Sequence, residues 1–417
     1  MNGFHLKNNR WYSDGVALSK IADKVGTPSY VYSLPAFEEK FKEVDQAYKS
    51  VPHLVAYAMK ANSNLTVIHS LAKLGAGADV VSGGELYKAR KAGVPVQKII
   101  FAGVGKTDKD IQYALEEGIR YFNVESVPEI EAINEVAKKM RKIASIAIRF
   151  NPDVDALTHH YISTGKKENK FGVFLGDLDQ VMETVRRSRS IHWTGVHAHI
   201  GSQMTQTAPV GKAARVVEEL VLKLRREGFP ITTVNLGGGY GIDYLNDDPP
   251  KASEYAKLVI PVIKRLNATL ILEPGRFISG NSGVLLTRVV YVKKSGKKTF
   301  YIVDAGMGEL IRPSLYEAYH RISPAEGPQK PVQTVDVVGP ICESGDFFAK
   351  GRKLPLMKRG DLMVVFSAGA YGSVMGSTYN ARPLAPEVVV RGNKFSVARV
   401  RQTWQDLVRQ EKIIIRT

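Results

Sequence analysis

The chain contains very little cysteine: Cys342 is the only one among its 417 residues. A single thiol cannot form a disulfide within the chain. This excludes a secreted scaffold held by internal disulfides and indicates a reducing compartment. The N-terminal stretch "MNGFHLKNNRWYSDG" lacks the apolar segment of a signal peptide, and no apolar run is long enough to span a bilayer. We therefore expect a soluble, cytoplasmic protein with no membrane partner.

Acidic residues are also in deficit, with 41 Asp and Glu against 58 Lys and Arg and a net charge of +17. A basic chain can bind nucleic acid or an anionic surface. Here, however, the basic residues form scattered blocks, and neither a basic tail nor interleaved aromatic residues accompany them. We interpret the blocks as solvated surface and expect no nucleic-acid partner. Attraction of an anionic cofactor or substrate stays open. The blocks are "KKMRK" (138–142), "RRSR" (186–189) and "KKSGKK" (293–298).

Short apolar runs alternate with longer amphipathic segments between residues 53 and 276. Buried apolar strands that alternate with helices indicate parallel βαβ units. Eight such units in a span of about 250 residues predict a closed (β/α)₈ TIM-type barrel, and the alternative is an open doubly wound sheet. The expected strands are 54–60, 77–82, 99–103, 121–126, 146–150, 195–201, 233–239 and 270–276.

The pattern changes after about residue 280, where strand-like segments follow one another with few helical signals. "GVLLTRVVYVKKSGKKTFYIVDAG" is typical of two strands joined by a glycine-containing turn. Because a chain of this length usually forms two domains, we predict a second, mostly antiparallel β domain. The predicted boundaries are 26–277 for the barrel, and 1–25 with 278–417 for the β domain.

Polar residues and glycines follow several of the expected strands at the end where this barrel carries its active site. Lys60 ends the first strand, where a buried lysine is costly unless it is used or paired. Gly237, Gly238 and Gly239 end the seventh, where backbone N–H groups can approach an anion closely. Glu273 ends the eighth. Each feature alone is more often structural, but a lysine, a phosphate loop and a carboxylate together match pyridoxal 5'-phosphate.

Seven stretches, in a single order along nearly the whole chain, resemble the diaminopimelate decarboxylase family. These are fold-type III, alanine-racemase-like enzymes that use pyridoxal phosphate. The stretches are "YAMKAN" (57–62), "HAHIGSQ" (197–203), "NLGGGYGIDY" (235–244), "EPGR" (273–276), "RPSLYEAYH" (312–320), "CESGD" (342–346) and "SAGAYG" (367–372).

The resemblance implies roles for the matching positions, with Lys60 and Cys342 as the catalytic residues. Lys60 would hold the cofactor covalently, and Cys342 would protonate the substrate Cα once carbon dioxide has left. The remaining cofactor-binding residues would be His199 on the ring face, Glu273 at the ring nitrogen, Tyr371, and a phosphate set of Ser202, Gly237, Gly238, Gly239, Gly275 and Arg276. The substrate would be bound by Arg276, Arg312, Tyr316, Glu343 and Tyr371. Cys342, Glu343 and Tyr371 would reach the active site of the partner subunit, which implies a homodimer.

The implied reaction converts meso-2,6-diaminopimelate to L-lysine and carbon dioxide, the last step of lysine biosynthesis. A carboxylate at position 273 favours a protonated ring nitrogen and thus decarboxylation, whereas a racemase of this fold usually places arginine there. Arg312 and Glu343 would supply the carboxylate and ammonium sites that this substrate needs. The alternatives are a related decarboxylase acting on carboxynorspermidine, arginine or ornithine, and a non-catalytic nucleic-acid-binding or regulatory homologue.

Cys342 taken alone leaves four interpretations open: a buried filler, a metal ligand, a nucleophile or a proton donor. We expect no metal site, because no other cysteine and no spaced histidine pair lies nearby. The resemblance favours the proton donor.

The polar segment 151–172 is long for a βα loop, so we expect it to act as a lid.

Overall fold

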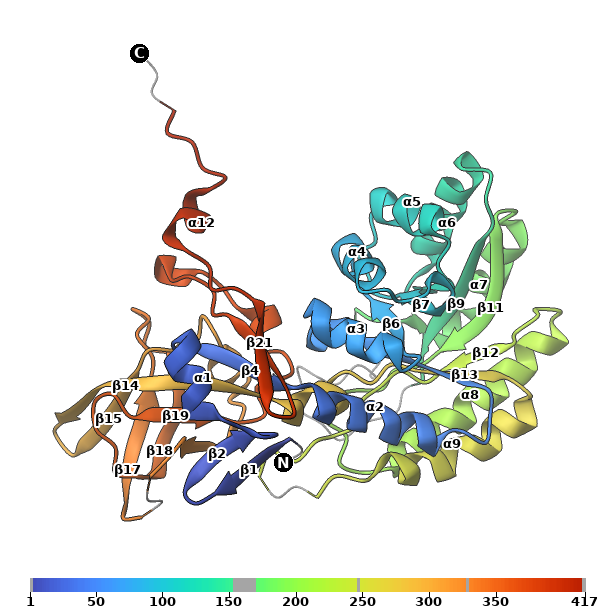
Figure 1. The fold of residues 1–417 in the computed structure, drawn as a ribbon. Helices are drawn as coiled ribbons and strands as arrows, with labels where there is room; N and C mark the ends of the chain where they lie inside the picture. The colour runs from blue at the N-terminus through green and yellow to red at the C-terminus, as the bar shows by residue number, and fades with distance from the viewer. Residues whose placement is uncertain (1–2, 153–169, 246–247, 328–329, 415–417) are drawn as a thin grey trace. The chain divides into compact units, whose positions relative to one another are not determined.

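The structure is a computed structural model that describes residues 3–152, 170–245, 248–327 and 330–414 (Figure 1). The chain divides into two compact units. One, which we call the barrel unit, comprises residues 38–243 and 247–278. The other, which we call the sheet unit, comprises residues 1–37, 244–246 and 279–417.

The barrel unit contains all eight predicted strands, joined in parallel into a closed ring. The ring closes because the fourth strand pairs with the fifth, and the eighth pairs with the first. Closure confirms the TIM-type barrel and excludes the open doubly wound sheet. In ring order the strands are β5 (His53–Ala58), β6 (Gly77–Val80), β7 (Ile99–Phe101), β8 (Tyr121–Val124), β9 (Ala144–Asn151), β11 (Ile191–His197), β12 (Thr233–Asn235) and β13 (Thr269–Leu272).

Helices precede, connect and follow these strands, and a short strand, β10 (Val173–Phe174), pairs with β9 in parallel. The basic blocks at 138–142 and 186–189 lie at the C-terminal ends of α6 and α7, where positive charge complements the helix dipole. The helices are α2 (Leu34–Ala47), α3 (Leu65–Lys73), α4 (Gly83–Lys91), α5 (Asp108–Glu117), α6 (Val127–Lys139), α7 (Leu178–Arg187), α8 (Ala208–Arg226), α9 (Ala252–Leu266) and α10 (Arg276–Ser279).

Local sequence signals set the ends of α5. The Thr107 side chain accepts a hydrogen bond from the Asp110 backbone N–H, and the Asp110 side chain accepts one from Thr107, which forms a capping box. At the other end Gly118 adopts the left-handed conformation that ends many helices. Ile111, Ala114 and Leu115 form its buried face.

The sheet unit is built mostly from antiparallel strand pairs, as predicted. A three-stranded sheet holds β1 (Phe4–Lys7), β2 (Arg10–Ser13) and β3 (Val16–Ala17). The larger sheet contains β4 (Ser29–Ser33), β14 (Gly283–Ser295), β15 (Lys298–Val303), β16 (Ile322–Pro324), β17 (Val332–Val338), β18 (Phe347–Pro355), β19 (Leu362–Val365), β20 (Glu387–Arg391) and β21 (Lys394–Arg399). The described part of this unit also holds the helices α1 (Leu18–Val25), α11 (Arg312–Tyr316) and α12 (Trp404–Val408).

The sheet unit extends to residue 37, beyond the boundary predicted at residue 26. Strand β4 pairs with β14 and β20 of the larger sheet, so "SYVYS" belongs to the sheet unit. All five of its residues are buried. A short buried strand carries no local signal of which sheet it joins, so the boundary could not be placed from this stretch alone.

Each unit has its own apolar core. Side chains from five barrel strands fill the barrel interior: Leu54, Ala56, Ile100, Tyr121, Ala147 and Ile271. Tyr121 also links this core to polar groups above it, because its hydroxyl accepts a hydrogen bond from Asn235 Nδ2 at 3.2 Å. In the sheet unit, β4, β14, β19 and β20 pack their apolar residues against α1 and β1–β3.

No helix in the described parts of the chain combines the length and apolar character needed to cross a membrane.

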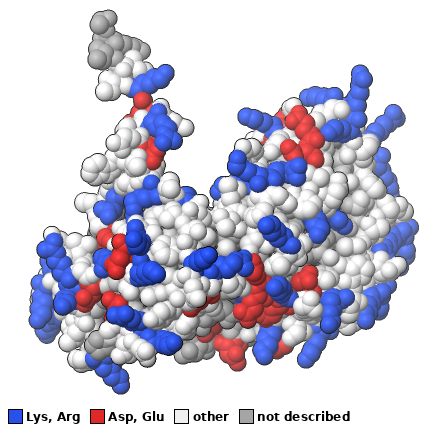
Figure 2. All heavy atoms as spheres, viewed as in Figure 1, with Lys and Arg blue, Asp and Glu red and all other residues white. Residues whose placement is uncertain are grey.

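On the face drawn in Figure 2, Lys and Arg side chains are spread widely, and Asp and Glu side chains lie among them. The block at 293–298 spans the β14–β15 hairpin turn, as predicted.

Candidate active site

The C-terminal ends of the barrel strands bring together the predicted barrel residues. Lys60 lies in a 3₁₀ turn, η1 (Met59–Ala61), directly after β5. His199 and Ser202 follow β11, the glycines 237–239 follow β12, and Glu273, Gly275 and Arg276 follow β13. This edge is where barrels of this type carry their chemistry.

Lys60 reaches across to the neighbouring strand, where its Nζ lies 3.3 Å from Asp79 Oδ2. The Asp79 side chain is fully buried, while that of Lys60 is 44% exposed. Burial raises the pKa of Asp79, and the positive charge of Lys60 opposes that shift. The lysine amine is thus held at the barrel mouth by a buried carboxylate but remains accessible.

Glu273 is surrounded by amide donors from two other strands. Asn123 Nδ2 and Asn235 Nδ2 both donate to Glu273 Oε1, at 2.9 and 2.6 Å. Burial, reinforced by the charge of Asp79, raises the pKa of Glu273 to about 8. Both amides occupy Oε1, which favours a proton on Oε2, and Oε2 lies 3.5 Å from His197 Nε2.

His199 lies against the glycine turn that follows β12. The Gly238 N–H donates to His199 Nδ1 at 3.3 Å, which places the proton of the neutral ring on Nε2. Burial lowers the pKa of His199 well below its usual value, so the ring is neutral. Gly237 has φ +65°, and a Cβ there would lie 2.4 Å from His199 Nδ1, so only glycine fits beside the ring.

Ser202 and Arg276 form the other side of this turn. Arg276 Nε and Nη2 lie 3.3 and 3.2 Å from Ser202 Oγ, and the arginine is 6% exposed. The loop holding Ser202 is joined to the glycine turn, since Met204 N donates to Gly239 O at 2.9 Å. The N–H groups of Gly237 and Gly238 donate to Asn235 Oδ1 and His199 Nδ1, whereas the hydroxyl of Ser202 and the guanidinium of Arg276 lie together and suit a phosphate.

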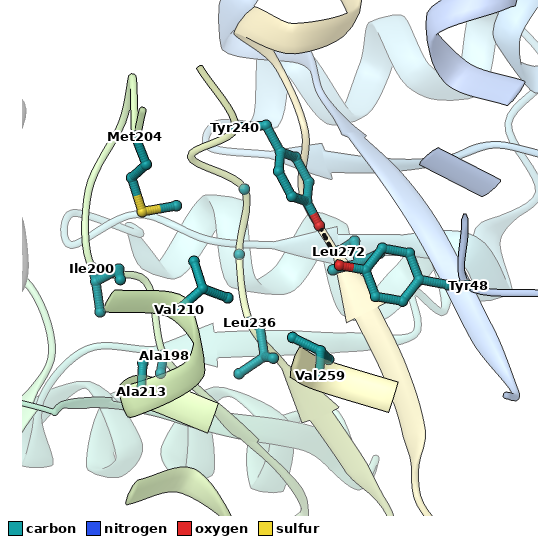
Figure 3. A pocket seen from close by; sticks show the side chains of 12 residues that line it. Tyr48, Ala198, Ile200, Met204, Val210, Ala213, Leu236, Tyr240, Val259 and Leu272 are labelled. Atoms are coloured by element: carbon teal, nitrogen blue, oxygen red, sulfur yellow. Dashed lines mark hydrogen bonds between the residues drawn. The ribbon is translucent and has the colours of Figure 1, made fainter. Parts of the chain in front are cut away.

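A small cavity of about 20 Å³ is lined in part by Gly237 and Gly238, and Figure 3 shows its other lining side chains. It has room for about one water molecule. Its wall is mainly apolar, and its polar part is the pair Tyr48 and Tyr240, whose hydroxyls are hydrogen-bonded at 2.8 Å. Tyr240 also packs edge-on against Tyr255, at 4.7 Å between ring centroids. The tyrosine pair and two residues of the glycine turn therefore line the same cavity.

The sheet unit holds the other predicted residues. Arg312 begins α11, is 6% exposed, and has its guanidinium over the rings of Tyr244 and Tyr316, at 5.5 and 5.8 Å. Its Nη2 donates to the Tyr244 hydroxyl at 3.1 Å. His320 lies 3.4 Å from Arg312 Nε. The arginine predicted to bind a carboxylate is thus fixed among aromatic rings together with Tyr316.

Cys342 and Glu343 lie in an exposed turn between β17 and β18. The Cys342 N–H donates to Asn380 Oδ1 at 2.7 Å. Glu343 Oε1 accepts from the Gly345 N–H at 3.1 Å. Tyr371 is half-buried and has φ +55°, a strained value for tyrosine. These three residues belong to the sheet unit, like Arg312.

The barrel residues fit pyridoxal phosphate as a group. Lys60 offers an amine, Ser202 and Arg276 offer an anion site, and Glu273 offers a buried carboxyl that suits a ring nitrogen. The flat, neutral ring of His199 contacts the glycine turn through the bond from the Gly238 N–H.

Comparison with known proteins agrees with this arrangement. Residues 34–280 match the family model described as "Pyridoxal-dependent decarboxylase, pyridoxal binding domain". The diaminopimelate decarboxylase of Pseudomonas aeruginosa is 45% identical over 414 residues, covering 99% of this chain and 100% of that protein. That of Zymomonas mobilis is 44% identical over 414 residues, covering 98% of each. The chain belongs to the diaminopimelate decarboxylase family.

Solved structures of this family have the same fold. The diaminopimelate decarboxylase of Helicobacter pylori, crystallised with L-lysine, superposes with a TM-score of 0.91 at 40% identity, over 94% of this chain and 98% of that one. Family membership confirms the predicted resemblance and the pyridoxal phosphate cofactor.

Sequence reasoning assigned no role to Asp79, Asn123 or Asn235, which hold the predicted residues of this decarboxylase in place. Each is a fully buried polar residue in a barrel strand. That pattern, a polar side chain inside an otherwise apolar strand, was the available signal. The predicted lid at 151–172 falls largely on residues 153–169, which lie outside the described residues.

Proposed function

We propose that this protein decarboxylates meso-2,6-diaminopimelate to L-lysine and carbon dioxide, the last step of lysine biosynthesis. The observation that carries the proposal is full-length similarity, at 44–45% identity, to curated diaminopimelate decarboxylases. The Helicobacter pylori relative binds L-lysine, the product of this reaction. No observation favours carboxynorspermidine, arginine or ornithine as the substrate.

We assign cofactor binding to the barrel set. Lys60 would hold the cofactor covalently through Nζ, and His199 would stack on its ring. Ser202, Gly237, Gly238, Gly239, Gly275 and Arg276 would bind its phosphate, with Tyr371 as a further contact. When bound, the cofactor accepts the electron pair that carbon dioxide leaves at Cα.

Glu273 would keep the ring nitrogen protonated. With a pKa of about 8, it carries a proton at neutral pH before the cofactor enters. Asn123 and Asn235 occupy Oε1, which favours this proton on Oε2, the oxygen beside His197 Nε2. As a carboxylate, Glu273 would favour a positive charge on a ring nitrogen placed beside it. An arginine at this position would disfavour that charged ring.

The substrate would be recognised at its far end. Arg312, Tyr316 and Arg276 would bind the distal carboxylate, because a guanidinium donates two parallel hydrogen bonds to such a group. Glu343 would bind the distal ammonium. The aromatic rings around Arg312 restrict its side chain, so less entropy is lost when it binds.

Cys342 would donate the proton that replaces carbon dioxide at Cα: the S–H bond breaks, a C–H bond forms, and solvent reprotonates the sulfur. The exposure of Cys342 and Glu343 in the single chain supports their serving a partner subunit in a homodimer. We place this enzyme in the cytoplasm, in keeping with its single free thiol.

Carbon dioxide release tests the proposal. We expect pyridoxal-phosphate-dependent release from meso-diaminopimelate, faster than from carboxynorspermidine, arginine or ornithine, and abolished in Lys60→Ala. A higher kcat/KM for any of the other three substrates would refute the assignment. Tight, salt-sensitive DNA binding without decarboxylation would favour the non-catalytic alternative.

A further inference from the structure

Asp346 lies at the end of the turn that carries Cys342, and its carboxylate is buried, with 4% of the residue exposed. Both oxygens accept backbone hydrogen bonds: Oδ1 from Met307 N at 2.6 Å, and Oδ2 from Ile341 N at 2.7 Å. The Asp346 carbonyl also accepts from Gly339 N at 3.1 Å. One residue thus joins both ends of the turn to the segment after β15.

The surrounding backbone leaves room for this carboxylate and little else. A Cβ on Gly339 would lie 2.4 Å from Asp346 Oδ2, and a Cβ on Gly306 would lie 2.8 Å from both oxygens. Two glycines therefore line the carboxylate where any side chain would collide with it. The turn is built around Asp346.

Two further bonds fix the residues between these ends. Asn380 Oδ1 accepts from Cys342 N at 2.7 Å, and Ser314 Oγ donates to Gly345 O at 2.5 Å. Ser314 belongs to α11, the helix of Arg312 and Tyr316. The side chains of Cys342 and Glu343 remain exposed while their backbone is held.

We propose that Asp346 is a positioning residue that places the Cys342 thiol and the Glu343 carboxylate for the reaction. This inference rests on the proposed function. A proton donor must sit within hydrogen-bond reach of the carbon it serves, and an error of about 1 Å can cost about 100-fold in rate. A free exposed turn would have to be ordered at every turnover, whereas the buried carboxylate orders it in advance.

The test compares Asp346→Asn with wild-type holoenzyme. The amide keeps the size of the side chain but points an N–H₂ group at one of the two backbone N–H donors. We expect kcat to fall at least about tenfold with cofactor affinity unchanged. Cys342 is the only thiol, so its alkylation rate by iodoacetamide reports the geometry of the turn directly. We expect that rate to change at least about threefold.

Asp336→Asn is the matched control. Asp336 is a buried carboxylate of the same unit that accepts a backbone hydrogen bond, from Gly351 N at 2.6 Å. It should lower stability while leaving kcat and the alkylation rate at wild-type values. If Asp346→Asn does not fold, Ser314→Ala removes the milder Gly345 bond and should shift the alkylation rate in its place.

The outcomes separate the two proposals. An alkylation rate that changes less than threefold overturns the positioning role, even if the variant is less stable. A changed rate with unchanged kcat also overturns it. A changed rate in a protein whose wild type releases no carbon dioxide from diaminopimelate refutes the proposed function instead.

Discussion

At the scale of single residues, Glu273 shows how the environment sets the chemistry. Its residue type is ordinary, but burial and the nearby Asp79 raise its pKa to about 8. The two asparagines occupy Oε1, which favours the proton on Oε2. Neighbouring histidines respond in the opposite direction, because burial lowers the pKa values of His197 and His199 well below 6.5.

The raised pKa of Glu273 predicts a pH dependence of stability in the cofactor-free protein. Between pH 4.5 and 8 the folded state holds the proton more tightly than the unfolded state, so the free energy of unfolding falls as pH rises. Near pH 6.5 the two histidines bind protons more readily in the unfolded state than in the folded state, a contribution of opposite sign that wild type and Glu273→Gln share. Between pH 6.5 and 8, the free energy of unfolding measured with denaturant should therefore change more negatively with rising pH for wild type than for Glu273→Gln. Equal slopes would contradict the prediction.

At the scale of elements, the active site depends on pairs of loops rather than on single strands. The loop after β11 is bonded to the turn after β12 through Met204 and Gly239. The tyrosine pair lines the small cavity together with Gly237 and Gly238 of the same turn. A turn with three consecutive glycines is otherwise costly to order, since glycine loses the most conformational freedom on folding.

Tyr48→Phe tests whether the tyrosine pair supports the turn. The change leaves the Tyr240 hydroxyl buried without its partner, which should lower the free energy of unfolding by about 1–3 kcal/mol. Because the turn binds phosphate in the proposed enzyme, the Kd for pyridoxal phosphate should rise about fivefold, equivalent to about 1 kcal/mol. Fluorescence titration measures it. Tyr301→Phe, which removes a buried hydroxyl bond to Pro355 O in the sheet unit, should leave that Kd unchanged.

At the scale of the whole molecule, the proposed site residues are divided between two units of one chain. Lys60, His199 and Glu273 belong to the barrel unit, and Cys342, Glu343 and Tyr371 belong to the sheet unit. The proposed homodimer would combine sets from different subunits. A complete site would then require two chains.

Mixed dimers test this sharing. Lys60→Ala and Cys342→Ala homodimers should each lose about 100-fold or more in activity. After dissociation and reassembly of an equal mixture, about half of the dimers are mixed and each has one intact site, so about a quarter of wild-type activity should return. If mixed dimers form without any recovery, Cys342 does not act across the interface.

The sequence was sufficient to predict the barrel because each of the eight strands is a short apolar run followed by a helix. It did not place β4, whose partners lie more than 240 residues away along the chain. Asp79, Asn123 and Asn235 were missed for the same kind of reason. Their roles depend on which strands become neighbours when the ring closes, and no local pattern contains that information.

The single thiol also affects how well the protein resists oxidation. Exposed thiols oxidise first to a sulfenic acid, which a second cysteine can rescue by forming a disulfide, and then irreversibly to higher acids. This chain has no second cysteine, so external thiols alone could rescue Cys342. An unassembled chain exposes that sulfur to solvent. Pairing of subunits would therefore protect the enzyme from oxidative ageing as well as complete it.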